Sequence, residues 1–124
     1  AAALAASRAD QKDLHSIESV QEKLERANRN GELGVDEDYM FHYSIIEACH
    51  NSLYKSVFNS ISEKFEEGIG LSKMQSARMP GQFEEGNREH RRIIEALLKQ
   101  DSQEAAKAMR DHLVNNERKV WDNL

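Results

Sequence analysis

Asp38-Tyr-Met-Phe-His42 is the stretch around which this chain is organised, and it lies in a run from about 36 to 50 that predicts a helix. Asp38 and His42 are four residues apart, so a carboxylate and an imidazole share one helical face. Such a pair can close on one cation, and His90 and His112 recur at the same kind of helical position later in the chain. We interpret the four residues as a mononuclear metal site inside a helical bundle.

A core salt bridge is the competing interpretation, and for a lone Asp38–His42 pair it would be preferred. Polar groups embedded in an apolar face lose their hydration unless a partner satisfies them, and a metal ion is one such partner. His90 lies three residues before Ile93 and so shares its apolar face, and His112 lies on the inward strip of the last helix. Inward histidines on three separate helices favour the metal site.

Composition predicts one soluble, all-helical domain over residues 1–124. The chain is long enough for a single core, and it is 39% hydrophobic and 31% charged, with one proline and six glycines. Strand-type alternation is nowhere sustained. The formal net charge of −5 argues against a nucleic-acid-binding surface on this chain, because phosphate binding depends on clustered Lys and Arg.

Cysteine use and hydropathy indicate a cytoplasmic protein. Cys49 is the only cysteine, so no intramolecular disulfide can form. The longest apolar run, residues 1–6, is far too short to cross a bilayer. The chain begins without methionine, as though partway along a helix, which suggests a fragment of a longer protein.

Apolar spacing predicts an antiparallel bundle of about six helices with a central metal and effector pocket. Asp10 and Asp36 are the expected N-caps of the second and third helices. Apolar positions in the fourth are Leu53, Val57, Ile61, Phe65, Ile69 and Leu71. The expected helices cover residues 1–8, 10–30, 36–50, 53–79, 82–99 and about 101–124.

Four segments together resemble the FCD domain, the C-terminal effector-binding domain of FadR-type regulators in the GntR family of bacterial transcription factors. They are Asp38-Tyr-Met-Phe-His42, Glu47-Ala-Cys-His-Asn51, Glu89-His-Arg-Arg-Ile-Ile-Glu-Ala-Leu-Leu98 and Ala108-Met-Arg-Asp-His112-Leu113. The resemblance covers essentially the whole chain.

The resemblance implies a metal site, a small organic acid that binds at the metal, and a homodimeric parent protein that binds DNA. Asp38, His42, His90 and His112 match the residues that coordinate one divalent ion in metal-binding members of the family. A small organic acid such as lactate, gluconate, citrate or pyruvate, or water, completes the coordination there. Such regulators are homodimers that bind operator DNA through an N-terminal winged helix-turn-helix domain, which this chain does not contain.

The charges of the four candidate ligands would let a bound metal ion attract an anion. Three neutral imidazoles and one carboxylate leave a divalent ion with a net charge near plus one, and imidazole suits zinc or nickel. The same open site is compatible with hydrolysis, so a metal-dependent hydrolase-like bundle stays an alternative, although no complete acid and base set is evident. A metal-free structural bundle is the third possibility.

Further effector-contacting residues are expected within a turn of the ligands or beside the loop at Pro80. Two arginines are candidates for a two-pronged contact with an anion, and four other side chains follow from helical spacing. The candidates are Arg78, Arg88, Asn87, Asn115, Asn116 and Cys49. No exposed stripe in the sequence identifies the dimer interface.

Overall fold

The computed structural model describes residues 1–122, which form six helices and no strand. This confirms the predicted all-α bundle. None of the described helices is both long enough and apolar enough to span a bilayer. The helices are α1 (Ala2–Arg8), α2 (Gln11–Arg29), α3 (Val35–Ala48), α4 (Ser52–Ser76), α5 (Gln82–Leu98) and α6 (Ser102–Asp122).

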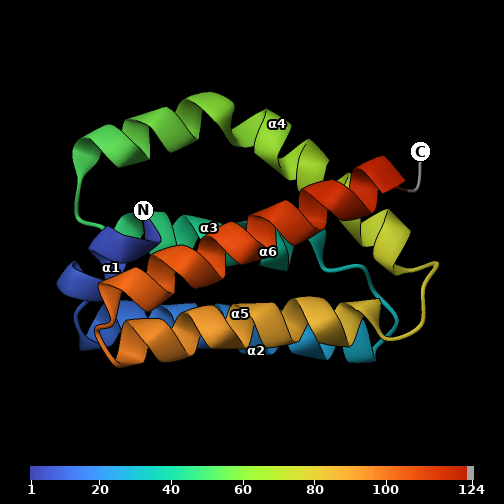
Figure 1. Cartoon of the computed structure of the whole chain (residues 1–124), viewed down its shortest axis with the longest axis horizontal. Helices are drawn as coiled ribbons and strands as arrows, with labels where there is room; N and C mark the ends of the chain where they lie inside the picture. Colours follow the sequence, from blue (N-terminus) through green and yellow to red (C-terminus); the bar gives the residue numbers. More distant parts are fainter. Residues whose placement is uncertain (123–124) are drawn as a thin grey trace.

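The long helices run roughly along one axis, and α4 bows over the rest (Figure 1). Helix α3 packs between α2 and α4, and α5 packs between α2 and α6. The short α1 contacts α3, α5 and α6 at the end of the bundle where the chain begins. Helices α3, α5 and α6 are not all in direct contact, but their side chains meet in a common interior, although α3 and α6 are more than fifty residues apart in the sequence.

The core lies between these helices and is built from apolar residues at helical spacing. Its largest fully buried members include Ile17 on α2, Phe41 and Ile45 on α3, and Ile93 and Leu97 on α5. Buried alanines on α1 and α6 complete the cluster, since their small side chains allow close helix contact. The apolar stripes that predicted these helices thus face the interior.

Local signals set most of the helix ends. Asp10 caps α2 as predicted, and it forms a reciprocal capping box with Asp13. The expectation that Asp36 caps the third helix is wrong, because α3 begins at Val35 and Gly34 is its N-cap. Gly34 has a φ of 78°, and a Cβ there would lie 2.5 Å from Leu24 Cδ1, so only glycine fits this turn.

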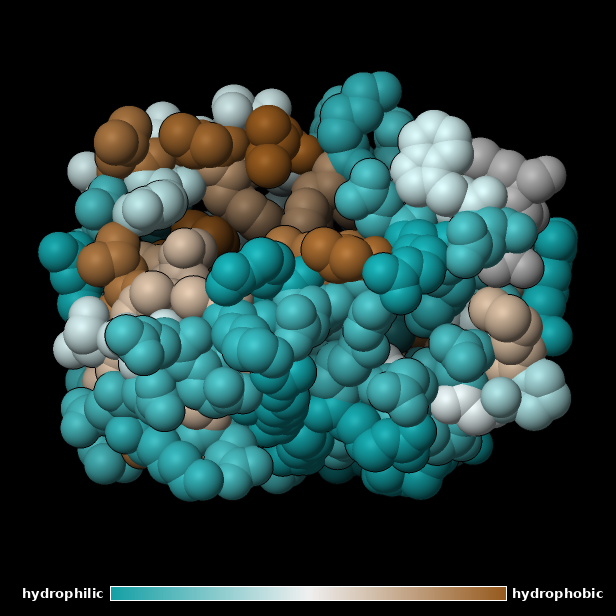
Figure 2. All heavy atoms as spheres, in the orientation of Figure 1, coloured by the Kyte–Doolittle hydropathy of each residue, from teal (hydrophilic) through white to brown (hydrophobic). Residues whose placement is uncertain are grey.

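The apolar positions of α4 divide into a buried and an exposed group. Ile69 is buried and Phe65 is half-buried, but Leu53, Val57 and Ile61 are 70%, 52% and 48% exposed. On the face of the molecule drawn in Figure 2, apolar side chains gather along α4. Part of the α4 stripe is therefore not packed by the described chain, and Leu71 is exposed as well.

Candidate metal centre

The predicted ligands come from three helices and meet in the interior. Asp38 and His42 lie one turn apart on α3, His90 lies on α5 and His112 on α6. All four side chains are buried, with between 1% and 5% of each residue exposed. Buried charged or titratable groups are rare unless they are paired or bind a metal, so their convergence needs a specific partner.

The ligand atoms lie at distances that suit one ion. Nε2 of His90 is 3.0 Å from Nε2 of His112, and Oδ1 of Asp38 is 3.3 Å from Nε2 of His42 and 3.6 Å from Nε2 of His90. One nitrogen from each histidine lies within 4.8 Å of those of the other two. Bonds of about 2.0–2.2 Å from a zinc-like ion to nitrogen and oxygen place neighbouring donors at such separations.

Two outer side chains fix which nitrogen of each ring faces the cluster. Nδ1 of His112 donates to Oε1 of Glu89 at 2.6 Å. Nδ1 of His90 donates to Oε1 of Gln21 at 2.7 Å, because the Gln21 amide nitrogen already donates to Glu25 and Asn87. In the neutral rings both Nε2 atoms then carry lone pairs.

The two Nε2 atoms lie 3.0 Å apart, and Nδ2 of Asn116 lies 3.4 Å from that of His112. Two acceptors 3.0 Å apart repel unless a proton or a cation lies between them. The Nδ1 partners of His90 and His112 match the outer hydrogen bonds that orient histidine ligands in metal sites. The three imidazoles therefore fit one divalent ion, and the Asp38 carboxylate lies close to two of them.

Burial and charge keep these groups in metal-binding protonation states. Burial lowers the pKa of His90 well below its usual range and lowers the pKa of His42, so both imidazoles are neutral near pH 7. Burial alone would raise the pKa of Asp38, but His90, His42 and Lys73 together hold it well below its usual value. A neutral imidazole and an ionised carboxylate are the forms that bind metal.

A small cavity of about 20 Å³ adjoins the cluster, and two ammonium groups face it. Nζ of Lys73 lies 2.9 Å from Oδ2 of Asp38, and Nζ of Lys119 donates to Ser76 Oγ at 2.9 Å. Burial lowers the pKa of Lys119. The lining residues are Asp38, Ile69, Ser72, Lys73, Ser76, Gln82, Gly86, His112, Asn116 and Lys119. Two lysines beside the candidate ligands provide positive charge for an anion.

Four residues of this site were not predicted from the sequence, and Lys119 on α6 is one of them. Gln21 lies four residues after Ile17 and three before Leu24, so a polar side chain within an apolar stripe was the signal. Lys73 lies four residues after Ile69 on the buried face of α4, where its charge suggested solvent. Glu89 is half-buried, and its carboxylate accepts a hydrogen bond from Nδ1 of His112 across the two helices.

The structure brings only some of the predicted effector residues to the cluster. Nδ2 of Asn116 lies 3.4 Å from Nε2 of His112, and Asn115 donates to the outer carboxylate of Glu89 at 2.9 Å. Cys49 lies seven residues beyond His42, and its Sγ is 2.9 Å from the carbonyl oxygen of Ala1. Arg78 is exposed in the α4–α5 connection and does not line the inner cavity.

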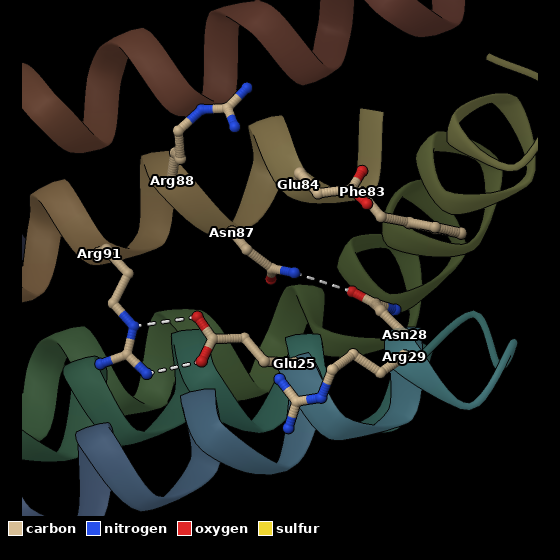
Figure 3. Close-up of a pocket in the computed structure, with 8 residues that line it drawn as sticks. All are labelled: Glu25, Asn28, Arg29, Phe83, Glu84, Asn87, Arg88 and Arg91. Atoms are coloured by element: carbon tan, nitrogen blue, oxygen red, sulfur yellow. Dashed lines mark hydrogen bonds and ion pairs between the residues drawn. The ribbon is translucent and has the colours of Figure 1, made fainter. Parts of the chain in front are cut away.

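Asn87 and Arg88 line a different hollow, of about 470 Å³, between α2 and α5 (Figure 3). Asn87 donates to Asn28 Oδ1 at 3.1 Å and accepts from Gln21 Nε2 at 3.1 Å, so it reaches the cluster only through Gln21 and His90. The Arg88 side chain points away from Asn87 and pairs with Glu85. Neither residue touches the inner cavity.

We expect Gln21→Leu to weaken metal binding about 10- to 100-fold, the usual effect of losing an outer partner of a histidine ligand. The leucine keeps most of the volume but cannot accept the His90 Nδ1 proton. Zinc titration of the metal-free protein against a competing chelator measures this. Gln103→Leu, at an exposed position of α6, is the matched control. Equal zinc affinity for both variants would show that Gln21 does not orient His90.

Comparison with known proteins adds independent information. The profile of the family described as FCD domain matches residues 1–115. The HTH-type transcriptional regulator LutR of Bacillus subtilis is 30% identical over 122 residues, which cover 94% of this chain and 53% of LutR. The Glc operon transcriptional activator of Escherichia coli K12 is 29% identical over 126 residues, or 98% of this chain and 50% of the activator. The chain spans about half the length of these curated relatives.

Proposed function

The chain belongs to the FCD domain family of GntR-type transcription regulators, and we propose that residues 1–124 are a sensor domain that binds a divalent metal ion and a small carboxylate effector. In this proposal Asp38, His42, His90 and His112 hold the ion. The domain itself carries no catalytic step, and a separate domain binds DNA.

One observation carries the proposal: Nε2 of His90 lies 3.0 Å from Nε2 of His112 and 3.6 Å from Oδ1 of Asp38 in the buried interior. A proton between the two nitrogens would satisfy them as a hydrogen bond, but it would not use the Asp38 carboxylate. A cation relieves the repulsion and uses the carboxylate at the same time. Imidazole ligands favour zinc or nickel among the common divalent ions.

The neighbouring charges support an anionic effector. Three neutral imidazoles and one carboxylate leave the bound ion with one net positive charge, and Lys73 and Lys119 lie at the same cavity. The metal, when bound, supplies a Lewis-acidic contact for an effector oxygen. The ammonium groups of the two lysines then lie close enough to attract the carboxylate charge, and Asn116 offers an amide donor.

Signal transfer follows from linkage between two arrangements of the helices. An effector that binds one arrangement better shifts the population toward that arrangement. The change in the equilibrium constant cannot exceed the ratio of the effector's affinities for the two arrangements. We infer that the parent protein is a cytoplasmic homodimer whose two DNA-binding domains contact a two-fold operator. The similarity to two transcriptional regulators supports this role.

The test is binding of small acids to untagged protein with and without metal. We expect about one zinc or nickel ion per chain by elemental analysis. Calorimetry with lactate, gluconate, citrate and pyruvate should then detect binding of at least one acid to the metal-loaded protein and none to the metal-free protein. Failure to take up metal after incubation with zinc and nickel would refute the proposed site.

A further inference from the structure

A second hollow, of about 340 Å³, opens between α4 and α6 directly beside the metal cluster. Its walls are mainly apolar, and they include Phe65 and Ile69 from α4 and Leu113 and Trp121 from α6. The one metal-ligand candidate that lines it is His42. Apolar side chains lie on both α4 and α6 in Figure 2.

The hollow and the inner cavity share part of their lining. Ile69, Ser72 and Asn116 line both spaces. The inner cavity, at about 20 Å³, has room for about one water or one small polar group. Any ligand larger than that group must extend past the shared residues, and the 340 Å³ hollow is the adjoining space that lies against His42.

His42 differs from the other two histidines in its outer hydrogen bonding. Nδ1 of His90 and Nδ1 of His112 each have an acceptor, but Nδ1 of His42 has no hydrogen-bond partner among residues 1–122. His42 is 5% exposed, and no fully buried side-chain nitrogen of the described chain lacks a partner, so this Nδ1 is reachable by solvent. Nε2 of His42 lies 3.3 Å from Oδ1 of Asp38 and donates to that carboxylate, so in the neutral ring Nδ1 keeps its lone pair and can accept a hydrogen bond.

Charge at the hollow does not favour a charged occupant. Lys64 and Glu117 carry opposite charges at its lining, and Lys64 also pairs with Glu67 at 3.5 Å. The positive groups Lys73 and Lys119 face the inner cavity instead. The two adjoining spaces therefore suit the two ends of one amphipathic molecule.

We propose that the hollow receives the side chain of the effector, so that the domain selects a monocarboxylic acid with an aromatic or branched aliphatic side chain. This inference rests on the proposed function. The carboxylate lies at the metal and the lysines, and the apolar side chain packs beside His42 on Phe65, Ile69, Leu113 and Trp121. A small or highly hydroxylated acid would leave these apolar side chains exposed to water and so gain no affinity from them.

A larger side chain at Gly68 would fill the hollow without displacing other residues. It lines the hollow, and a Cβ at Gly68 would meet no atom within 4 Å, so a larger side chain has space there. Leucine also favours a helix more than glycine does, so Gly68→Leu should fold. Gly70→Leu is the matched control, because Gly70 is on the same helix with equally open space but does not line the hollow.

The probes are lactate and phenyllactate, which share one head group and differ in an aromatic ring. We expect the zinc-loaded protein to bind phenyllactate at least tenfold more tightly than lactate, with a change in the fluorescence of Trp121, the only tryptophan. Gly68→Leu should remove this preference while lactate affinity and metal content stay unchanged. Gly70→Leu should keep the preference.

Each other outcome overturns the inference in a distinguishable way. Equal binding of the two acids to the unmodified protein, or a preference that survives Gly68→Leu, refutes the side-chain site but leaves the metal and carboxylate site intact. A changed oligomeric state in Gly68→Leu with an unchanged preference shows that a second copy covers the hollow. Binding of neither acid to the zinc-loaded protein refutes the inference together with its premise.

Discussion

His90→Ala is expected to abolish stoichiometric metal binding while the protein keeps its helical content. His90 lies at the centre of the cluster, since its Nε2 is 3.0 Å from His112 Nε2 and 3.6 Å from Asp38 Oδ1. Losing an outer partner costs about 10- to 100-fold in metal affinity, so losing a direct ligand should cost more. Elemental analysis and chelator competition measure the loss, and circular dichroism reports the helices.

Two further histidine variants show whether the ion lies at the buried cluster or at the surface. Asp10, Asp13 and His50 form the other group of possible ligands among the described residues, and that group is mostly exposed. His50→Ala should leave metal content unchanged, whereas His112→Ala should repeat the His90→Ala result from a different helix. Metal lost in His50→Ala and kept in His90→Ala would place the ion at the surface group instead.

Lys73→Met should destabilise the metal-free protein by about 3–5 kcal/mol, the range for removing one partner of a buried ion pair. Lys73 is 7% exposed, and its Nζ lies 2.9 Å from Oδ2 of the buried Asp38. Methionine fills most of the same space, so the main change is that the Asp38 carboxylate loses its buried cation. Urea denaturation of metal-free protein, followed by circular dichroism, gives the free energy of unfolding.

Zinc should reduce this loss, because an ion bound at Asp38 replaces the missing positive charge. The matched control is Lys64→Met on the same helix, where the side chain is 85% exposed and pairs with Glu67. Surface pairs contribute at most about 1 kcal/mol, so we expect a small effect there with or without zinc. An identical loss for Lys73→Met in zinc-loaded and metal-free protein would argue that the ion does not contact Asp38.

Local sequence signals predicted the helices and the histidines for the same reason. Both depend on the 3.6-residue period, which places Asp38 next to His42 and His90 on the face of Ile93. The cap of α3 could not be predicted as well. Asp36 is a favourable capping residue, but the close approach of Leu24 to Gly34 decided where the helix begins.

The outer residues were not predictable from spacing, because each depends on a contact between distant segments. Gln21 contacts His90, which is 69 positions away in the sequence. Lys73 on α4 contacts Asp38 on the preceding helix, α3. A polar residue in an apolar stripe, as at Gln21, indicates that some buried partner exists without naming it. Cys49 was predicted near the site from helical spacing, but it is the C-cap of α3, and its Sγ contacts the carbonyl oxygen of Ala1.

By itself the sequence determined the all-α class, the helix boundaries to within a few residues and the four inward-facing candidate ligands. These properties follow from short-range periodicity and capping, which any segment carries within itself. Only the tertiary structure decided that Nε2 of His90 and Nε2 of His112 face each other near Asp38, that Lys73 and Lys119 line the cavity, and that an apolar hollow lies against His42. Those features depend on how helices pack, and packing joins residues that no local pattern relates.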